Sequence, residues 1–372
     1  MDNELKYPIA KPDLSGNELK YVSKAVADGW VSSKGKFITD FESNFSQYVG
    51  RDFGVSTSNG TTALHLAIRA LGIGKGDKVI VPDLTFAAPA NAVLYEGAVP
   101  VFIDSSADYW NIDPDLIEEK IDNRTKAIIA VHLYGHSCDM DPIMKIAEKN
   151  NLMVIEDCAE APGAKYKGRQ VGTFGVVSCY SFYGNKIITT GEGGMCLSND
   201  ENLAMRMRIL RDHGMSAEKR YWHDEVGYNY RMTNLQAALG VAQLQRMPEF
   251  IEKRRDIASW YGGFLSKKAG ITNHPEMPWS TNAYWLYSIL VKERGENERD
   301  DLMTKLKRDG VESRPFFYPL DTMPPYQNFV GSQTFTVSAD LSSRGMNLPT
   351  YTGLNKEDIR YICNKILENT DN

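Results

Sequence analysis

The sequence has no long apolar run and no apolar segment at its start. Its 372 residues contain no stretch of about 18 uninterrupted apolar residues, so no transmembrane helix and no membrane partner are expected. The first residues, Met1-Asp2-Asn3-Glu4, lack the basic region and apolar core of a secretory signal peptide. These two absences predict a cytoplasmic protein.

Paired cysteines and an excess of positive charge are also missing. The five cysteines are dispersed and form no C-x-x-C pair, which predicts reduced thiols and no zinc site. A formal net charge of -6 argues against a nucleic-acid partner, because a surface that neutralises phosphates normally makes a chain basic. The basic run Lys253-Arg254-Arg255 falls in a helical pattern and is expected to be a solvated helix face.

What the sequence does have is a regular alternation of short apolar strands with helices. The expected strands are 78–82, 99–104, 127–131, 153–156 and 176–182, and the helices between them are 61–71, 87–95, 114–121 and 142–150. Such alternation predicts an α/β fold with a mostly parallel sheet and helices on both faces. Sheets of this kind bind ligands at the carboxyl ends of their strands.

The pattern changes after residue 234, which predicts two domains. Helices are expected at 235–247 and 248–268, followed by a strand at 284–291, a helix at 298–309, a strand-like segment at 311–317 and a terminal helix at 355–367. We therefore expect a large domain over 1–247, which includes an N-terminal helical segment, and a smaller C-terminal α/β domain over 248–372. The cleft between two such domains is the default place for a substrate.

Three separate segments supply the residue types that pyridoxal phosphate chemistry needs. Lys186 lies between a predicted strand and a glycine cluster, and Asp157 ends the apolar run of another strand. The turn 58–62 opens a helix with free backbone N–H groups and hydroxyls, which suits a phosphate dianion. A lysine forms the Schiff base, and a carboxylate keeps the ring nitrogen of the cofactor protonated.

Each of these residues has a purely structural alternative when it is considered alone. Lys186 by itself is most simply a solvated charge, and Asp157 could cap a following helix. Phe86 follows a strand and either stacks on the cofactor ring or belongs to the core. Ser181 lies five residues before Lys186 and could reach the same phosphate, whereas His65 is expected to be a satisfied core residue.

Four motifs give the chain a family resemblance over about residues 7–368. They are segments 58–64, 156–161, 181–186 together with 190–194, and 227–233. In these segments the sequence resembles the sugar aminotransferases of the DegT/DnrJ/EryC1/StrS family, which have the fold-type-I architecture of pyridoxal phosphate-dependent transferases. The resemblance implies the same large and small domains and pyridoxal 5'-phosphate as the cofactor.

The resemblance also implies roles for the residues around the cofactor ring. Lys186 corresponds to the Schiff-base lysine that also carries the proton, and Asp157 to the partner of the pyridinium nitrogen. Phe86 corresponds to the stacking residue. Glu160 lies where the ring hydroxyl is expected, at a position where family members often have Gln or His.

A second group of residues is expected to hold the phosphate. Gly60, Thr61 and Ser181 correspond to phosphate contacts within one chain, and Asn59 beside them is a further cofactor-binding candidate. Asn229 resembles the residue that reaches the phosphate of the neighbouring subunit's cofactor. The implied active unit is a homodimer with shared active sites.

The resemblance implies the transfer of the amino group of glutamate to C4 of a nucleotide-linked 4-keto-6-deoxy sugar. GDP-4-keto-6-deoxy-mannose, giving GDP-perosamine, is the expected substrate. Likeness in segments 30–35, 132–136, 221–224 and 314–319, outside the cofactor motifs, favours this sugar. Ser33, Arg314 and Tyr318 in or near these segments are the substrate-binding candidates, since Arg suits a diphosphate and Tyr a base.

Three alternatives remain open from the sequence. A related 3-dehydratase acts on the same keto sugar but has histidine in place of the lysine, and position 186 is lysine here. The same amination chemistry could act on a UDP- or dTDP-linked sugar. The third alternative is a regulatory protein that binds pyridoxal phosphate without catalysis.

Overall fold

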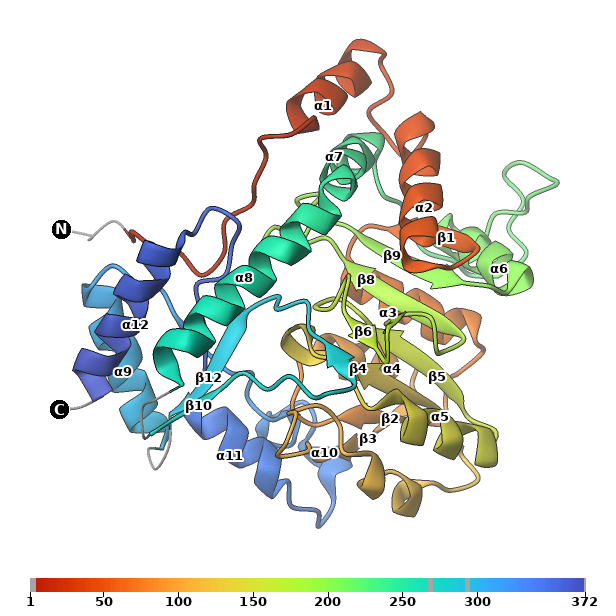
Figure 1. The fold of residues 1–372 in the computed structure, drawn as a ribbon. Coiled ribbons are helices and arrows are strands. Elements are labelled where there is room, and N and C mark those ends of the chain that lie inside the picture. Colours follow the sequence, from red (N-terminus) through yellow and green to blue (C-terminus); the bar gives the residue numbers. More distant parts are fainter. Residues whose placement is uncertain (1–4, 267–269, 292–294, 371–372) are drawn as a thin grey trace.

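The computed structural model describes residues 5–266, 270–291 and 295–370, and a seven-stranded sheet lies at its centre (Figure 1). The order of the strands is β1-β9-β8-β5-β4-β2-β3. Their bounds are β1 Phe53–Thr57, β2 Lys78–Pro82, β3 Val99–Ile103, β4 Thr125–Val131, β5 Met153–Asp157, β8 Val177–Ser181 and β9 Gly194–Ser198. Neighbours from β3 to β8 pair in parallel, and β9 runs opposite to both of its neighbours. The predicted mostly parallel α/β sheet is confirmed.

Helices cover both faces of this sheet because its strands are apolar on both sides. Val79 and Val81 of β2 pack into the core beneath α3, α4 and α6, whereas Ile80 points to the opposite face and packs with α5. Further along that opposite face, α2 and α7 cover β8 and β9. The bounds of the helices are α2 Lys36–Val49, α3 Gly60–Ala70, α4 Ala88–Tyr95, α5 Met140–Lys149, α6 Glu201–Arg211 and α7 Asn234–Gln245.

One predicted helix of this layer is wrong. Residues 114–121 form two single turns of 3-10 helix, η1 (Pro114–Leu116) and η2 (Glu118–Lys120), instead of one α-helix. Ile117 between the two turns is fully buried. Short 3-10 turns are common in connections of this length.

The C-terminal part forms a second, four-stranded antiparallel sheet in the order β10-β12-β14-β13. Helices α8, α9 and α12 enclose one apolar core with this sheet (Figure 1). The bounds are α8 Met247–Leu265, β10 Ile271–Asn273, β12 Tyr287–Val291, α9 Glu296–Arg308, β13 Arg314–Pro315, β14 Gly345–Leu348 and α12 Lys356–Thr370. The sequence predicted a strand at 284–291, which contains β12, and a strand-like segment at 311–317, which contains β13; β10 and β14 were missed because they have only three and four residues. The predicted end of the first helix at 267–268 lies outside the described residues.

The expected division into two domains at residue 247 stays a prediction. Each of the two parts also contributes side chains to the core of the other. Tyr7 from the N-terminal segment packs in the core of the C-terminal sheet. Leu320, Tyr326 and Phe335 pack in the core beneath α3 and α4 of the large sheet. In addition, β11 (Ser280–Thr281) pairs with β6 (Lys165–Tyr166), which in turn pairs with β7 (Arg169–Gln170).

The prediction of a solvated basic face on α8 is wrong for its central residue. Arg254 is only 3% exposed. Its guanidinium donates hydrogen bonds to the carbonyl oxygens of Trp285 and Thr350, at 2.7 and 2.9 Å. The guanidinium of Arg254 is therefore hydrogen-bonded to backbone carbonyl groups and not to solvent as expected.

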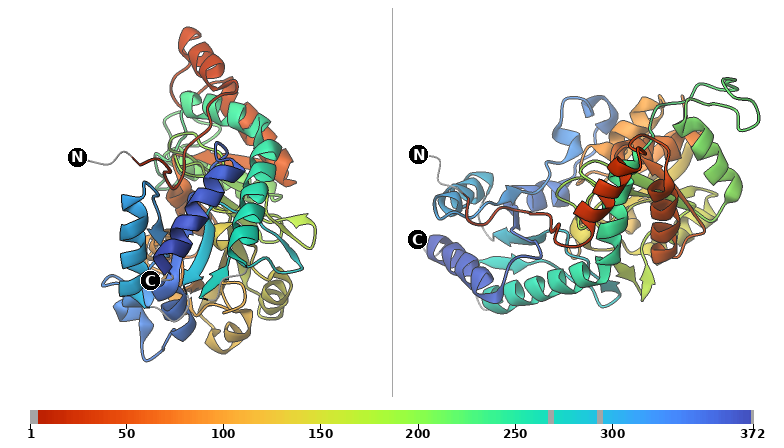
Figure 2. Two further views of the ribbon diagram at one scale, coloured as in Figure 1. Left: turned by 60° about the vertical axis from the view of Figure 1, so that its left-hand side comes forward. Right: turned by 90° about the horizontal axis from the view of Figure 1, so that it is seen from above.

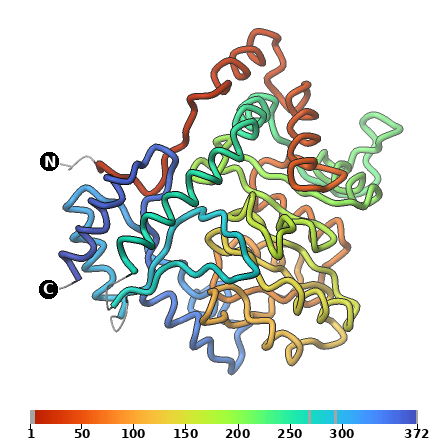
Figure 3. Tube along the Cα trace, viewed as in Figure 1, coloured from red at the N-terminus to blue at the C-terminus, as the bar shows by residue number. Residues whose placement is uncertain are grey.

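Two segments project from the body of the molecule. Helix α1 (Glu18–Ala27) packs against α7 and projects beyond the body of the molecule in the left view of Figure 2, and the loop between α6 and α7 extends outward in Figure 3. Both segments present large apolar side chains to solvent, among them Leu19 and Val26 on α1 and Tyr221, Trp222 and Val226 on the loop. No helix in the described part of the chain is long and apolar enough to cross a membrane.

Candidate active site

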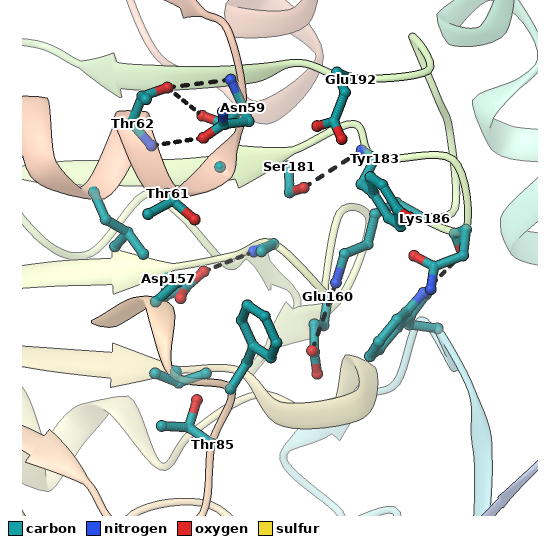
Figure 4. Close-up of a pocket in the computed structure, with 18 of the residues that line it drawn as sticks. Asn59, Thr61, Thr62, Thr85, Asp157, Glu160, Ser181, Tyr183, Lys186 and Glu192 are labelled. Atoms are coloured by element: carbon teal, nitrogen blue, oxygen red, sulfur yellow. Dashed lines mark hydrogen bonds and ion pairs between the residues drawn. The ribbon is translucent and has the colours of Figure 1, made fainter. Parts of the chain in front are cut away.

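A cleft of about 760 Å³ opens at the carboxyl ends of the central strands. Its walls come from β4, β5 and β8, from the N-terminus of α3, and from the C-terminal part of the chain. This volume is within the usual range for a small-molecule site. The predicted residues that line it are Asn59, Gly60, Thr61, Phe86, Asp157, Glu160, Ser181, Lys186 and Arg314 (Figure 4).

The N-terminus of α3 forms one end of the cleft. Asn59 caps the helix: its side chain accepts the backbone N–H of Thr62 at 2.9 Å, and the Thr62 hydroxyl accepts the backbone N–H of Asn59 at 3.1 Å. The first N–H groups of a helix have no intrahelical acceptor and attract anions. A Cβ on Gly60 would lie 2.8 Å from the Cβ of Ser181, so only glycine lets α3 approach β8 this closely.

The loop that carries Lys186 connects two antiparallel strands. Ser181 at the end of β8 pairs with Gly194 at the start of β9, and the residues between them turn over the cleft. The backbone N–H of Lys186 donates to the carbonyl of Tyr183 at 2.9 Å. The side chain of Lys186 is only 11% exposed and points toward Glu160 (Figure 4). The solvated-charge alternative for Lys186 is therefore wrong.

Lys186 and Glu160 form a close ion pair, and each affects the pKa of the other. Lys186 Nζ lies 3.5 Å from Glu160 Oε1. Burial lowers the pKa of Lys186, although the carboxylates of Glu160 and Asp157 oppose that shift. Burial also raises the pKa of Glu160 to about 7. Burial thus moves the two pKa values toward one another, which is the direction that favours proton transfer between a lysine and a carboxylate.

Asp157 presents its carboxylate to the cleft from the end of β5. One oxygen accepts the backbone N–H of Ala159 at 3.0 Å, two residues further along the chain. No helix follows in the described chain before β6, so this contact is an Asx-type turn and the helix-cap alternative is wrong. Burial raises the pKa of Asp157, and the positive charge of Lys186 opposes that shift. A second cation in the cleft would likewise favour its ionised form.

Phe86 lies on the rim of the cleft and is not a core residue. Its side chain is 57% exposed, and its ring centroid is 5.7 Å from that of Phe317. An exposed aromatic face toward a cleft is available for stacking.

Three predicted residues do not line this cleft. Ser33 is half-buried and Tyr318 is exposed, and neither belongs to the lining. Asn229 is also exposed, and its side-chain oxygen accepts a hydrogen bond from Arg231 at 2.9 Å. Asn229 therefore lies outside the cleft of its own chain.

The structure adds residues that the sequence analysis did not identify. Thr85, Tyr183, Glu192 and Trp285 all line the cleft. Thr85 directly precedes Phe86, and Tyr183 lies within segment 181–186. Both residues follow the end of a predicted strand, and this position could have identified them as candidates for the site. Trp285 lies about 100 residues from Lys186 in sequence, and no local pattern connects the two.

One buried group of metal-ligand types occurs beside the cleft among the described residues. His132, Glu156 and Cys158 place one ligand atom each within 4.8 Å of the others. Backbone N–H groups of three residues, Gly172, Phe174 and Gly175, already donate to the Glu156 carboxylate. The Nδ1 atom of His132 accepts the backbone N–H of Cys138 at 3.0 Å. The Glu156 carboxylate and one ring nitrogen of His132 are therefore engaged in structural hydrogen bonds.

The cleft fits the expected cofactor, pyridoxal phosphate. The N-terminus of α3 and the hydroxyls of Thr61 and Ser181 form a seat for a dianion at one end. The carboxylate of Asp157, the largely buried side chain of Lys186 and the exposed ring of Phe86 line the same cleft. Glycine at position 60 lets α3 approach β8 closely enough to form this seat, since a Cβ there would lie 2.8 Å from the Cβ of Ser181.

Comparisons with known proteins agree with this fit. Residues 12–367 match the DegT/DnrJ/EryC1/StrS aminotransferase family. A GDP-perosamine synthase of Escherichia coli O157:H7 is 47% identical over 98% of this chain and 99% of its own length, and one of Vibrio cholerae is 45% identical over 96% and 98%. A Streptococcus pneumoniae protein, assigned as a sugar aminotransferase and solved in its PLP form, superposes with a TM-score of 0.93 at 28% identity over 98% of both chains. The chain therefore belongs to the DegT/DnrJ/EryC1/StrS family and is a pyridoxal phosphate-dependent aminotransferase.

Proposed function

We propose that this aminotransferase transfers the amino group of glutamate to C4 of GDP-4-keto-6-deoxy-mannose and so produces GDP-perosamine. The placement of Lys186 in the cleft, 3.5 Å from Glu160, carries the proposal. Histidine at this position would favour dehydration, whereas a lysine can both bind the cofactor and carry a proton. Relatives at 45% and 47% identity, named GDP-perosamine synthase, support the choice of sugar.

When bound, pyridoxal phosphate supplies an aldehyde that takes up the donor's amino group and a ring that accepts electrons from the bond that breaks. We assign its phosphate to Asn59, Gly60, Thr61 and Ser181. Its ring is assigned to four other residues that line the cleft, namely Asp157, Phe86, Glu160 and Lys186.

The residues of the chain then divide the proton chemistry among them. Asp157 holds a proton at the ring nitrogen. Lys186, whose pKa burial lowers, removes the α proton of glutamate and returns a proton to C4 of the sugar in the second half of the reaction. Glu160 stays within reach of Lys186 and keeps the proton inside the cleft. Glutamate and keto sugar enter, and 2-oxoglutarate and amino sugar leave.

Arg314 is the substrate contact that the cleft favours. It lines the cleft, and its guanidinium is 3.2 Å from Glu312, which orients it without burying its charge. A guanidinium in this place suits the diphosphate of a nucleotide sugar. Ser33 and Tyr318 stay proposals for a substrate that extends beyond the lining.

We propose a homodimer with shared active sites as the active unit. The exposed position of Asn229 outside its own cleft supports a contact with the partner's cofactor phosphate. The apolar side chains of α1 and of the loop between α6 and α7 offer surface that a second copy would cover. A cytoplasmic location stays a prediction.

The substrate assignment is tested with a panel of 4-keto-6-deoxy sugars linked to GDP, UDP or dTDP. Each is incubated with the enzyme, pyridoxal phosphate and glutamate, and formation of 2-oxoglutarate is measured. We expect turnover with the GDP sugar to exceed that with the other two by at least about 100-fold in kcat/KM, since buried groups that bind one base stay unpaired with another. Equal or faster turnover of a UDP or dTDP sugar would overturn the assignment.

A further inference from the structure

Trp285 lies directly against the amine of Lys186. The Nζ atom of Lys186 is 3.6 Å from the centroid of the indole ring, so the amine sits over the ring face. The indole N–H also donates to the carbonyl of Asn185 at 2.9 Å, one residue before the lysine. Trp285 therefore contacts both the backbone and the reactive atom of the same short segment, from a distant part of the chain.

The backbone on either side of Trp285 is held rigidly. The preceding residue, Tyr284, has a φ of 47°, a left-handed conformation that costs free energy for any residue with a side chain. The side-chain oxygen of Asn282 accepts the backbone N–H of Tyr284 at 2.7 Å and stabilises this turn. On the other side, buried Arg254 donates to the carbonyl of Trp285 at 2.7 Å. No carboxylate among the described residues pairs with Arg254.

A second strained residue supports the same ring. Tyr134 has a φ of 52°, and its ring stacks on Trp285 with centroids 6.3 Å apart and planes inclined by 23°. The backbone N–H of Tyr134 donates to Glu160 at 2.8 Å. Tyr134 thus contacts both the indole of Trp285 and the carboxylate of Glu160, the two groups that lie next to the Lys186 amine. Backbone strain that surrounding contacts hold in place is typical of functional sites.

We propose that Trp285 is a positioning residue for Lys186, whose ring face holds the lysine as an ammonium group and whose N–H fixes the backbone that carries it. An ammonium over an indole face is attracted by the ring quadrupole, most strongly where water is excluded. Glu160 and Asp157 stabilise the same cation through their charges. Two further charged residues, Arg314 and Glu192, line the cleft. The proposal rests on the role of Lys186 as proton carrier.

The test measures the protonation of Lys186 without any turnover. Cofactor-free protein is treated with trace acetic anhydride across a pH series, and acetylation of the Lys186 peptide is quantified by mass spectrometry, since only the neutral amine reacts. In Trp285→Leu we expect the midpoint pH for Lys186 to fall by about one pH unit, because the ring no longer stabilises the cation. In Trp285→Phe, which keeps a ring, the midpoint should lie between those of Trp285→Leu and the unaltered protein.

A matched control removes another indole that faces a lysine. Lys253 Nζ lies 4.8 Å from the ring centroid of Trp260 on α8, and Trp260 does not line the cleft. Trp260→Leu should leave the Lys186 midpoint and kcat unchanged. With cofactor and substrates, Trp285→Phe should lower kcat while the KM for glutamate stays unchanged, since the ring positions the lysine and not the donor.

The outcomes separate this proposal from the proposed function. An unchanged or raised midpoint in Trp285→Leu would overturn the role of the ring, because simple rehydration of the amine would raise it. If Trp285→Leu does not fold, as circular dichroism would show, the Trp285→Phe midpoint decides alone. If the midpoint is lowered in Trp285→Leu but the unaltered protein aminates no sugar, the role of Trp285 is supported and the proposed function is rejected.

Discussion

At the scale of the residue, the site depends on ionisable side chains whose pKa values are shifted by burial. Lys186 and Glu160 would both be ionised in water, and in the cleft burial moves the pKa of each toward that of the other. The carboxylate of Asp157 also acts on the charge of the lysine and opposes the effect of burial on the pKa of Lys186. Shifted pKa values of this kind are typical of functional sites, whereas surface residues of the same types keep values near those in water.

Replacing Glu160 by Gln should change how stability depends on pH. The pKa of Glu160 rises from 4.5 to about 7 on folding, so the folded protein binds this proton more tightly. Its contribution to stability is then largest below pH 4.5 and is lost as the pH rises toward 7. We expect the free energy of unfolding of the cofactor-free protein to fall by about 2 kcal/mol less in Glu160→Gln than in the unaltered protein between about pH 5 and 8.

Urea unfolding at these two pH values measures that difference. Gln can still accept the backbone N–H of Tyr134, so the comparison isolates the charge. Parallel pH dependences in the two proteins would contradict the raised pKa.

Some residues of the site could be predicted from the sequence and others could not. Lys186 and Asp157 were predicted because their motifs stand at strand ends, where topology brings such ends together. Trp285 and Arg254 were not, since their roles come from contacts between segments distant in sequence. A helical pattern does not indicate that a cation such as Arg254 will be buried against carbonyl oxygens.

At the scale of the element, the close approach of α3 to β8 builds the phosphate seat. Asn59 caps the helix, and Gly60 allows contact with Ser181. A Cβ on Gly194 would lie 2.3 Å from the carbonyl of Asn59, so a second glycine is required on the strand side. The sequence predicted this helix start from its capping residues. It did not predict that residues 114–121 form 3-10 turns, because the apolar spacing there does not distinguish the two helix types.

Gly60→Ala should weaken cofactor binding. The added Cβ would be 2.8 Å from that of Ser181, so α3 must shift away from β8 and the seat widens. Overpacking of this kind costs about 1–3 kcal/mol, and the same loss of binding free energy would raise the Kd for pyridoxal phosphate by about 5- to 150-fold. Titration of cofactor-free protein by absorbance gives that Kd.

Gly184→Ala is the matched control in the same site. Its Cβ would meet nothing closer than 3.9 Å, so cofactor binding should be unchanged. Equal affinity in Gly60→Ala and the unaltered protein would exclude the N-terminus of α3 as the phosphate seat.

At the scale of the whole molecule, the cleft combines a parallel sheet with residues of an antiparallel one. Trp285, Arg314 and Phe317 come from the C-terminal part, and the remaining walls come from the large sheet. The sequence predicted a site between two domains. It underestimated how far the C-terminal segment around Leu320 and Tyr326 packs onto the large sheet, because that packing depends on the fold as a whole.

A mixing experiment tests the proposed sharing of sites between subunits. Lys186→Ala and Asn229→Ala chains should each be weakly active alone. After they are unfolded and refolded together in equal amounts, a mixed dimer contains one site with both residues intact. About half of the dimers are mixed, so activity should recover to about a quarter of the unaltered value. Activity equal to the mean of the separate variants would contradict shared sites.

The most direct test of the central claim follows the nitrogen atom. The unaltered enzyme and Lys186→Ala are incubated with pyridoxal phosphate, ¹⁵N-glutamate and GDP-4-keto-6-deoxy-mannose, and the sugar product is analysed by mass spectrometry and NMR. We predict ¹⁵N at C4 of the product with the unaltered enzyme, and a rate lower by more than about 1,000-fold with Lys186→Ala, which should still fold and should still bind pyridoxal phosphate through its phosphate seat. An unlabelled or dehydrated product from the unaltered enzyme, or undiminished labelling by Lys186→Ala, would contradict the account.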